Sequence, residues 1–149
     1  MSLRLAYWSA SPEALKAMSG VGDYIRKSGL DMKLVDLVYL RISQINGCAY
    51  CCDIHSHDLR KAGETDQRLD CLAGWRESPF YTDRERAALG WAESLTKVIE
   101  TQADDASYEA ARKTFNDKEL ADLTFAISLM NGWNRIGVGF RHGPKARKA

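Results

Sequence analysis

The chain has 149 residues, of which 45% are hydrophobic and 28% charged, and this is the composition of a soluble globular protein. A formal net charge of +1 supplies no field that would attract nucleic acid or a membrane surface. The length suits one domain with a sizeable core, covering residues 1–149. No apolar run is long enough to cross a bilayer, and the opening MSLRLAYWSA lacks the apolar centre of a signal peptide. We therefore expect a cytoplasmic protein.

The first third of the chain is predicted to form two helices. Ser11-Pro12-Glu13 supplies an N-cap serine, a proline in the first turn and an acid near the positive end of the helix dipole. This helix should end near Gly29, and a second should begin near Asp31. The apolar residues of the second helix repeat with a period of 3.6 rather than alternating; they are Leu34, Leu37, Val38, Ile42 and Ile45.

The middle third is predicted to form a third helix, a short fourth helix and a loop. Asn46-Gly47 ends the second helix. The third helix should run from about Cys48 to Ala62, with Gly63 as its C-terminal cap. Thr65 can cap a short helix that extends to Leu72. The loop GWRESPFY follows, and its aromatic side chains should hold it against the core.

The last third contains two capping-box patterns, in which a capping residue is followed three positions later by glutamate. Thr82-Asp-Arg-Glu85 should begin a long helix that ends near Val98, and another helix should cover about 107–115. Asn116 and Glu119 form the second capping box. The helix behind it carries one stripe of core-facing positions: Leu120, Leu123, Ile127, Met130 and Asn134.

The predicted fold class is therefore all-α, with one domain of about six or seven helices. We find no convincing strand pattern, internal repeat or low-complexity linker. Trp91 and Trp133 are expected in the core, although an apolar helix face can equally form a subunit interface.

A cluster of cysteines lies in the stretch QINGCAYCCDIHSHDLRKAGE, residues 44–64. In a reducing compartment, such clustering indicates catalytic or metal-binding cysteines rather than a structural disulfide. Residues three or four apart are neighbours on a helix. Cys48, Cys51 and His55 therefore lie in one line, as a redox dithiol with a proton-transfer partner requires.

The spacing leaves open which thiol attacks. Cys48 would lie at a helix N-terminus, where the dipole favours its thiolate, whereas Cys51 would lie beside His55, which can take its proton. A zinc site would need a fourth ligand, and His57 is rotated by about 200° from His55 on a helix. Inert core is the third interpretation.

The remaining cysteines are assigned structural roles. Cys52 lies four residues after Cys48 and could compete as its disulfide partner, but a buried apolar role is favoured. Cys71 is isolated and is assigned either to the core or to no role.

The run VDLVYLRISQINGCAYCCDIHSHDLRKAGE resembles the alkylhydroperoxidase AhpD-like proteins of the carboxymuconolactone decarboxylase family. GWRESPFYTDRERAALGWAESLT and NGWNRIG resemble the peroxidase-related branch, so the likeness covers at least residues 30–140. The resemblance implies an all-helical fold and thiol-dependent reduction of organic hydroperoxides. We expect no cofactor and no metal. It also implies a homo-oligomer, commonly a trimer or hexamer.

The family's functional residues map onto four positions. Its CxxC pair corresponds to Cys48 and Cys51, and its histidine to His55. Asp36 stands where the family has a glutamate, twelve residues before the first cysteine. Because aspartate is shorter, we expect either a water in the proton relay or a weaker relay. A second departure is Tyr50, at a position where the founding enzymes carry histidine.

Our favoured hypothesis is that one of the two cysteines, Cys51 in preference to Cys48, attacks a hydroperoxide with help from His55 and Asp36, and that Cys48 then closes a disulfide. An external dithiol, lipoyl or thioredoxin-like, would reduce the pair. Three other functions remain open: a general dithiol–disulfide oxidoreductase or redox sensor, a lyase like the family's decarboxylase, and a zinc-binding module.

Overall fold

The structure is a computed structural model that describes residues 2–146. Within that range every regular element is a helix, which confirms the predicted all-α class. Six of the helices have seven residues or more. The elements are α1 Tyr7–Ala10, α2 Pro12–Lys27, α3 Met32–Asn46, α4 Ala49–Lys61, α5 Asp66–Asp70, η1 Leu72–Gly74, α6 Asp83–Thr96, α7 Val98–Thr101, α8 Asp105–Thr114 and α9 Asp117–Phe140.

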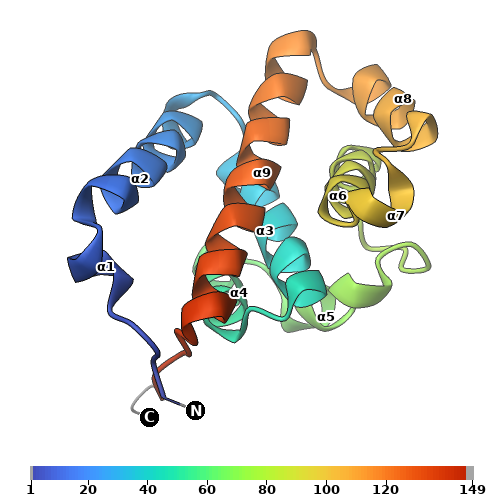
Figure 1. The fold of residues 1–149 in the computed structure, drawn as a ribbon. Coiled ribbons are helices and arrows are strands. Elements are labelled where there is room, and N and C mark those ends of the chain that lie inside the picture. The colour runs from blue at the N-terminus through green and yellow to red at the C-terminus, as the bar shows by residue number, and fades with distance from the viewer. Residues whose placement is uncertain (1, 147–149) are drawn as a thin grey trace.

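Helix α9 runs through the middle of the molecule, with α2 on one side and α6, α7 and α8 on the other (Figure 1). Helix α3 is the most deeply enclosed element because it packs against α4, α6 and α9. Its buried apolar side chains include Val35, Leu37, Val38 and Ile42, each no more than 1% exposed. The core therefore lies between α3 and α9, next to the start of α4.

Both predicted capping boxes are confirmed. The Thr82 and Asn116 side chains accept from the backbone N–H groups of Glu85 and Glu119, and the glutamates accept in return. The predicted cap at Ser11 is wrong in detail, because its side chain makes no capping hydrogen bond. Ser11 instead closes α1, since its N–H donates to the carbonyl of Tyr7.

The short helices explain the other differences from the predicted boundaries. Helix α6 ends at Thr96 rather than Val98, and the single turn α7 follows. Helix α5 ends at Asp70, and the 3₁₀ turn η1 takes up the residues that were assigned to its end. One-turn elements like α1 and α7 are too short to show a 3.6-residue period.

The two ends of the described chain are joined. The N–H of Arg4 donates to the carbonyl of Phe140 at 2.9 Å, and the Tyr7 hydroxyl lies 2.9 Å from Nδ1 of His142. The His142 ring in turn stacks on Tyr50, with ring centroids 4.1 Å apart. Figure 1 shows the described segments before α1 and after α9 on the same side of the molecule, below the start of α4. The segment before α2 is thus tied to the end of α9.

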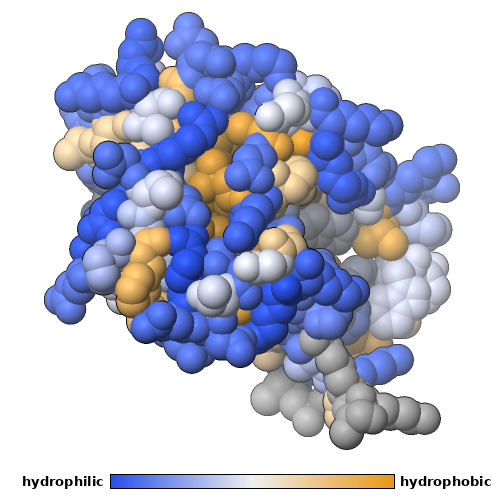
Figure 2. Space-filling model, turned by 180° about the vertical axis from the view of Figure 1, so that it is seen from behind, coloured by the Kyte–Doolittle hydropathy of each residue, from blue (hydrophilic) through white to orange (hydrophobic). Residues whose placement is uncertain are grey.

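Seen from behind, the surface is mostly hydrophilic, with hydrophobic residues gathered near its centre (Figure 2). None of the helices in residues 2–146 is both long and apolar enough to cross a membrane.

A buried polar contact joins α3 to α9. Asn134 is 1% exposed; its Nδ2 donates to Oγ of Ser43 at 3.0 Å, and its Oδ1 accepts from Nδ2 of Asn46 at 2.9 Å. Buried polar groups that lose a partner cost free energy that a solvated group does not. This contact therefore fixes how α9 sits on α3, one turn before the region that reaches the cysteines.

We expect Asn134→Ala to lower the free energy of unfolding by about 2–4 kcal/mol, because it removes both hydrogen bonds and leaves a small cavity. Urea unfolding of the variant measures the change. Ser128→Ala is the matched control: its hydroxyl donates to the carbonyl of Thr124 on the exposed side of the same helix, and its cost should stay within about 0.5 kcal/mol. Equal costs for the two variants would contradict the assigned role of Asn134.

Candidate active site

The cysteine pair lies at the start of α4. Gly47 ends α3 with φ +68°, a left-handed conformation that glycine adopts at low cost. Cys48 follows as the N-cap of α4, and its Sγ accepts from the N–H of Cys51 at 3.4 Å. The Cα atoms of Cys48 and Cys51 are 5.4 Å apart, and the two sulfurs are at disulfide distance. The predicted meeting of these two thiols therefore occurs.

A histidine and an aspartate meet between α4 and α3. Nδ1 of His55 lies 3.1 Å from Oδ1 of Asp36, with 13% and 23% of the two side chains exposed. The expectation of an intervening water is wrong, because α3 and α4 pack closely enough for the shorter aspartate to reach the ring. Such a contact fixes the orientation of an imidazole and favours the proton on Nδ1.

Tyr39 packs beside this pair. Its ring meets the His55 ring edge-on, with centroids 5.1 Å apart. Burial, and then the carboxylate of Asp36, raise the pKa of the Tyr39 hydroxyl, while Arg26 acts in the opposite direction. Tyr39 is therefore a neutral hydrogen-bond donor at physiological pH.

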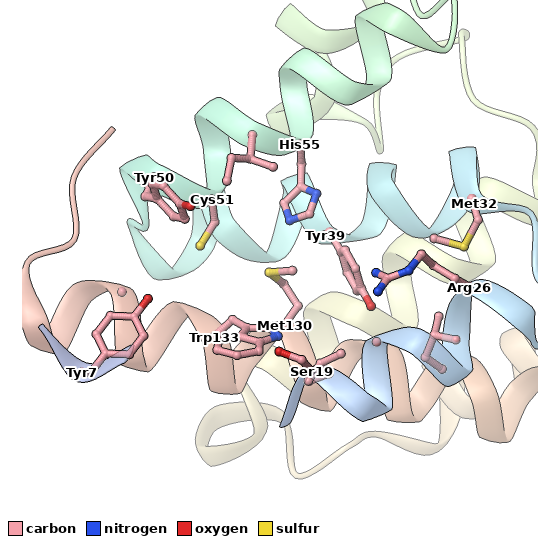
Figure 3. A pocket seen from close by; sticks show the side chains of 15 residues that line it. Tyr7, Ser19, Arg26, Met32, Tyr39, Tyr50, Cys51, His55, Met130 and Trp133 are labelled. Carbon is pink, nitrogen blue, oxygen red and sulfur yellow. The ribbon is translucent and has the colours of Figure 1, made fainter. Parts of the chain in front are cut away.

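A cavity of about 510 Å³ opens onto Cys51 and His55. Figure 3 shows both side chains projecting from α4 toward Met130 and Trp133 of α9, with Tyr39 between His55 and Arg26. The walls of the cavity are mainly apolar and aromatic, as in sites that bind small organic molecules. The cavity can therefore bring an apolar molecule to the sulfur of Cys51.

Cys48 is not part of the wall of this cavity. It is 1% exposed, and Gly137 of α9 lies against it. A Cβ on Gly137 would lie 3.1 Å from Sγ of Cys48 and 4.0 Å from Sγ of Cys51. The absence of a side chain therefore leaves room for Sγ of Cys48, whereas the distance to Sγ of Cys51 is an ordinary van der Waals contact.

Cys52 and His57, which also lie near the CxxC motif, contribute less to the candidate site. Burial raises the pKa of the Cys52 thiol, in keeping with the structural role predicted for it. Across residues 2–146 no group of three or more histidine, cysteine or acidic side chains is placed to hold a metal ion. The zinc arrangement that would have joined His57 to Cys48, Cys51 and His55 does not form.

Nothing in the sequence indicated that several residues of the cavity wall would lie there, although Met130 was expected on the core-facing stripe of its helix. Tyr7, Arg26, Met130 and Trp133 come from helices far apart in the chain. Trp133 was expected in the core, but it is only partly buried because it lines the cavity. Gly137 belongs to the NGWNRIG stretch, yet nothing in its spacing indicated contact with the cysteines.

Comparison with known proteins identifies a family whose model matches this chain and a protein with a similar sequence. Residues 12–94 match the model of the carboxymuconolactone decarboxylase family. The chain is 38% identical over 138 residues to YdfG of Bacillus subtilis (strain 168), an uncharacterized protein, and the match spans 93% of this chain and 94% of YdfG.

Solved structures show the same fold. One is a protein of unknown function from Agrobacterium tumefaciens, suggested to be the antioxidant defence protein AhpD (TM-score 0.94, 44% identity, 98% of this chain and 100% of that chain). A second is a peroxidase-related protein from Silicibacter sp. TM1040 (TM-score 0.78, 25% identity, 90% and 71%). A third, the debrominase Bmp8, shares the fold alone (TM-score 0.82, 19% identity, 93% and 74%).

Proposed function

The chain belongs to the carboxymuconolactone decarboxylase family, and on that basis we propose that it is a thiol-dependent peroxidase that reduces organic hydroperoxides. The observation that carries the proposal is Cys51, which faces an apolar cavity next to the His55–Asp36 pair and at disulfide distance from Cys48. An attacking thiol, a proton-transfer group and a resolving thiol are the three parts that such a reaction needs.

The first step uses Cys51 as the nucleophile. Its thiolate attacks the terminal oxygen of the hydroperoxide, the O–O bond breaks, and the alcohol leaves after gaining a proton. Cys51 becomes a sulfenic acid. His55 takes the thiol proton and returns it to the leaving oxygen, while Asp36 holds the ring in place.

The second step uses Cys48. Its thiol condenses with the sulfenic acid of Cys51, which releases water and forms the disulfide. An external dithiol, lipoyl or thioredoxin-like, then reduces the disulfide by exchange and is itself oxidised. We further propose that the protein acts as a homo-oligomer, a trimer or a hexamer, which native mass spectrometry tests.

One of the similar proteins supports the proposed peroxidase function. The Agrobacterium protein, at 44% identity, is the one suggested to be AhpD. The debrominase Bmp8 has the same fold with another activity, so the fold by itself does not select the reaction. The chemistry has to be tested on the cysteines of this chain.

The decisive experiment follows consumption of cumene hydroperoxide by the purified protein in the presence of dithiothreitol. We expect steady turnover that stops when the thiols are alkylated. If the disulfide forms and is reduced without peroxide consumption, the protein is a general dithiol oxidoreductase or a redox sensor. Activity toward a lactone after alkylation would instead assign it to the lyases.

We expect Asp36→Asn to lower kcat/KM for cumene hydroperoxide about 10- to 100-fold, because an amide no longer stabilises a protonated imidazole or fixes its tautomer. Asp36→Glu is the matched variant: it keeps the charge and restores the family's residue, so it should retain most of the activity. Stopped-flow oxidation of the reduced protein measures the affected step. Equal rates for Asn and Glu at this position would exclude Asp36 from the relay.

A further inference from the structure

The two sulfurs border different hollows. Cys51 lines the cavity of about 510 Å³ described above, and Cys48 lines a second hollow of about 380 Å³. Among the described residues, Gly137 alone lines both. The cysteine pair and Gly137 therefore form a partition, with one sulfur on each side.

The second hollow differs from the cavity in its chemistry. Small residues dominate its lining, which consists of Gly47, Cys48, Ala49, Gly137, Val138, Arg141, His142 and Gly143. Arg141 supplies a positive charge, and no acidic side chain is among these lining residues. The N-terminus of the 13-residue helix α4 lies at Cys48. Both features attract an incoming anion, and the reactive form of a thiol is its anion, the thiolate.

We infer that the reducing thiol enters through this second hollow and attacks Cys48, so that oxidant and reductant reach the dithiol from different sides. The inference rests on the proposed function for the identity of the oxidant. Because Cys48 is 1% exposed, the reductant has to be slender, which favours the lipoyl-type dithiol over the thioredoxin-like protein.

The exchange proceeds in two balanced steps. A thiolate of the external dithiol bonds to Sγ of Cys48, the Cys48–Cys51 bond breaks, and Cys51 leaves as a thiolate. The second thiol of the reductant then attacks the mixed disulfide, which frees Cys48 and carries away an oxidised reductant. Two electrons pass from the dithiol to the cysteine pair.

Attack on Cys48 has a useful result for the next cycle. The sulfur that leaves is Cys51, which faces the cavity that also contains His55. The nucleophile is thus released where the hydroperoxide binds. Alcohol remaining in the cavity does not block the entry of the reductant, because the reductant uses the other hollow.

Two tryptophan variants test the two entrances. Val138 is 48% exposed and lines the second hollow; Ser19 is exposed and lines the cavity. Disulfide made with diamide is reduced by dithiothreitol, and samples are quenched with maleimide for intact mass. Val138→Trp should slow this reduction by about tenfold or more, since exchange depends on access. Ser19→Trp should leave it unchanged and instead slow oxidation by cumene hydroperoxide.

The outcomes separate the two proposals. If Val138→Trp is reduced by dithiothreitol at the wild-type rate, or if Ser19→Trp is slowed as much as Val138→Trp, the reductant does not enter through the second hollow. Since diamide supplies the disulfide, the reduction rates decide the entrance even if hydroperoxides fail to oxidise the protein. That failure would count against the peroxidase function alone. Circular dichroism melting is the control for folding, and both variants should melt within a few degrees of the wild-type protein.

Charge provides an independent test. Arg141→Gln should slow initial attack by 3-mercaptopropionate several-fold more than attack by cysteamine, and added salt should remove the difference. For each thiol, the rate with the variant is divided by the rate with the wild-type protein, so the intrinsic reactivities of the two thiols cancel. Arg135→Gln is the control, since Arg135 is exposed on α9, the helix that ends just before Arg141, and lines neither hollow. Equal slowing of the two thiols by Arg141→Gln overturns the inference.

Discussion

Replacing Cys51 with serine will abolish peroxide turnover, with a loss of roughly 1,000-fold or more in kcat/KM. Serine keeps the size of the side chain, but its hydroxyl is far less acidic and less nucleophilic than a thiol. Neither neighbouring cysteine is expected to substitute for it, because Cys48 does not line the cavity and burial raises the pKa of the Cys52 thiol. A colorimetric assay of residual cumene hydroperoxide measures the loss.

The matched control is Cys52→Ser, which changes the adjacent thiol. It should retain activity within about twofold, because the proposed scheme gives Cys52 no role and a partly exposed position tolerates the change. If Cys52→Ser lost as much activity as Cys51→Ser, or if Cys51→Ser kept steady turnover, the attacking sulfur would have been misassigned.

Replacing Cys48 with serine has a different expected result: one turnover and then arrest. Cys51 still reduces one equivalent of hydroperoxide, but its sulfenic acid finds no thiol with which to condense. We expect a burst of about one alcohol per subunit, followed by a steady rate at least about 100-fold below wild type with a dithiol present. A dione reagent should trap the sulfenic acid on the peptide that contains Cys51.

The burst distinguishes a resolving cysteine from a nucleophile. Cys51→Ser should show neither burst nor trapped sulfenic acid, and it serves as the paired control. A Cys48→Ser protein that cycles at the wild-type rate would mean that the external thiol reduces the sulfenic acid directly. A missing burst would mean that Cys48, and not Cys51, attacks the peroxide.

The sequence was most informative where structure depends on neighbours along the chain. The two capping boxes, the break at Gly47 and the meeting of Cys48 with Cys51 all depend on residues a few positions apart. Local hydrogen bonds and helical spacing determine them, so they are readable from the residues alone.

Contacts between helices were not readable in this way. The pairing of Asp36 with His55 spans 19 positions and depends on how closely α3 packs on α4. The resemblance placed Asp36 near the site but could not give its reach. The cavity depends on even more contacts between helices, because five helices contribute to its wall. A periodic apolar pattern does not distinguish a core residue such as Trp91 from a residue such as Trp133, which lines the cavity.

The contact between Gly137 and the two sulfurs also bears on how the protein is made. During synthesis, α4 leaves the ribosome long before residue 137 does. Until α9 docks, the thiols of Cys48 and Cys51 lack the partition that separates their two hollows. The segment before α2 likewise waits for Phe140 before it can bond. The nascent polypeptide therefore carries the two thiols before α9 supplies its part of the walls around them.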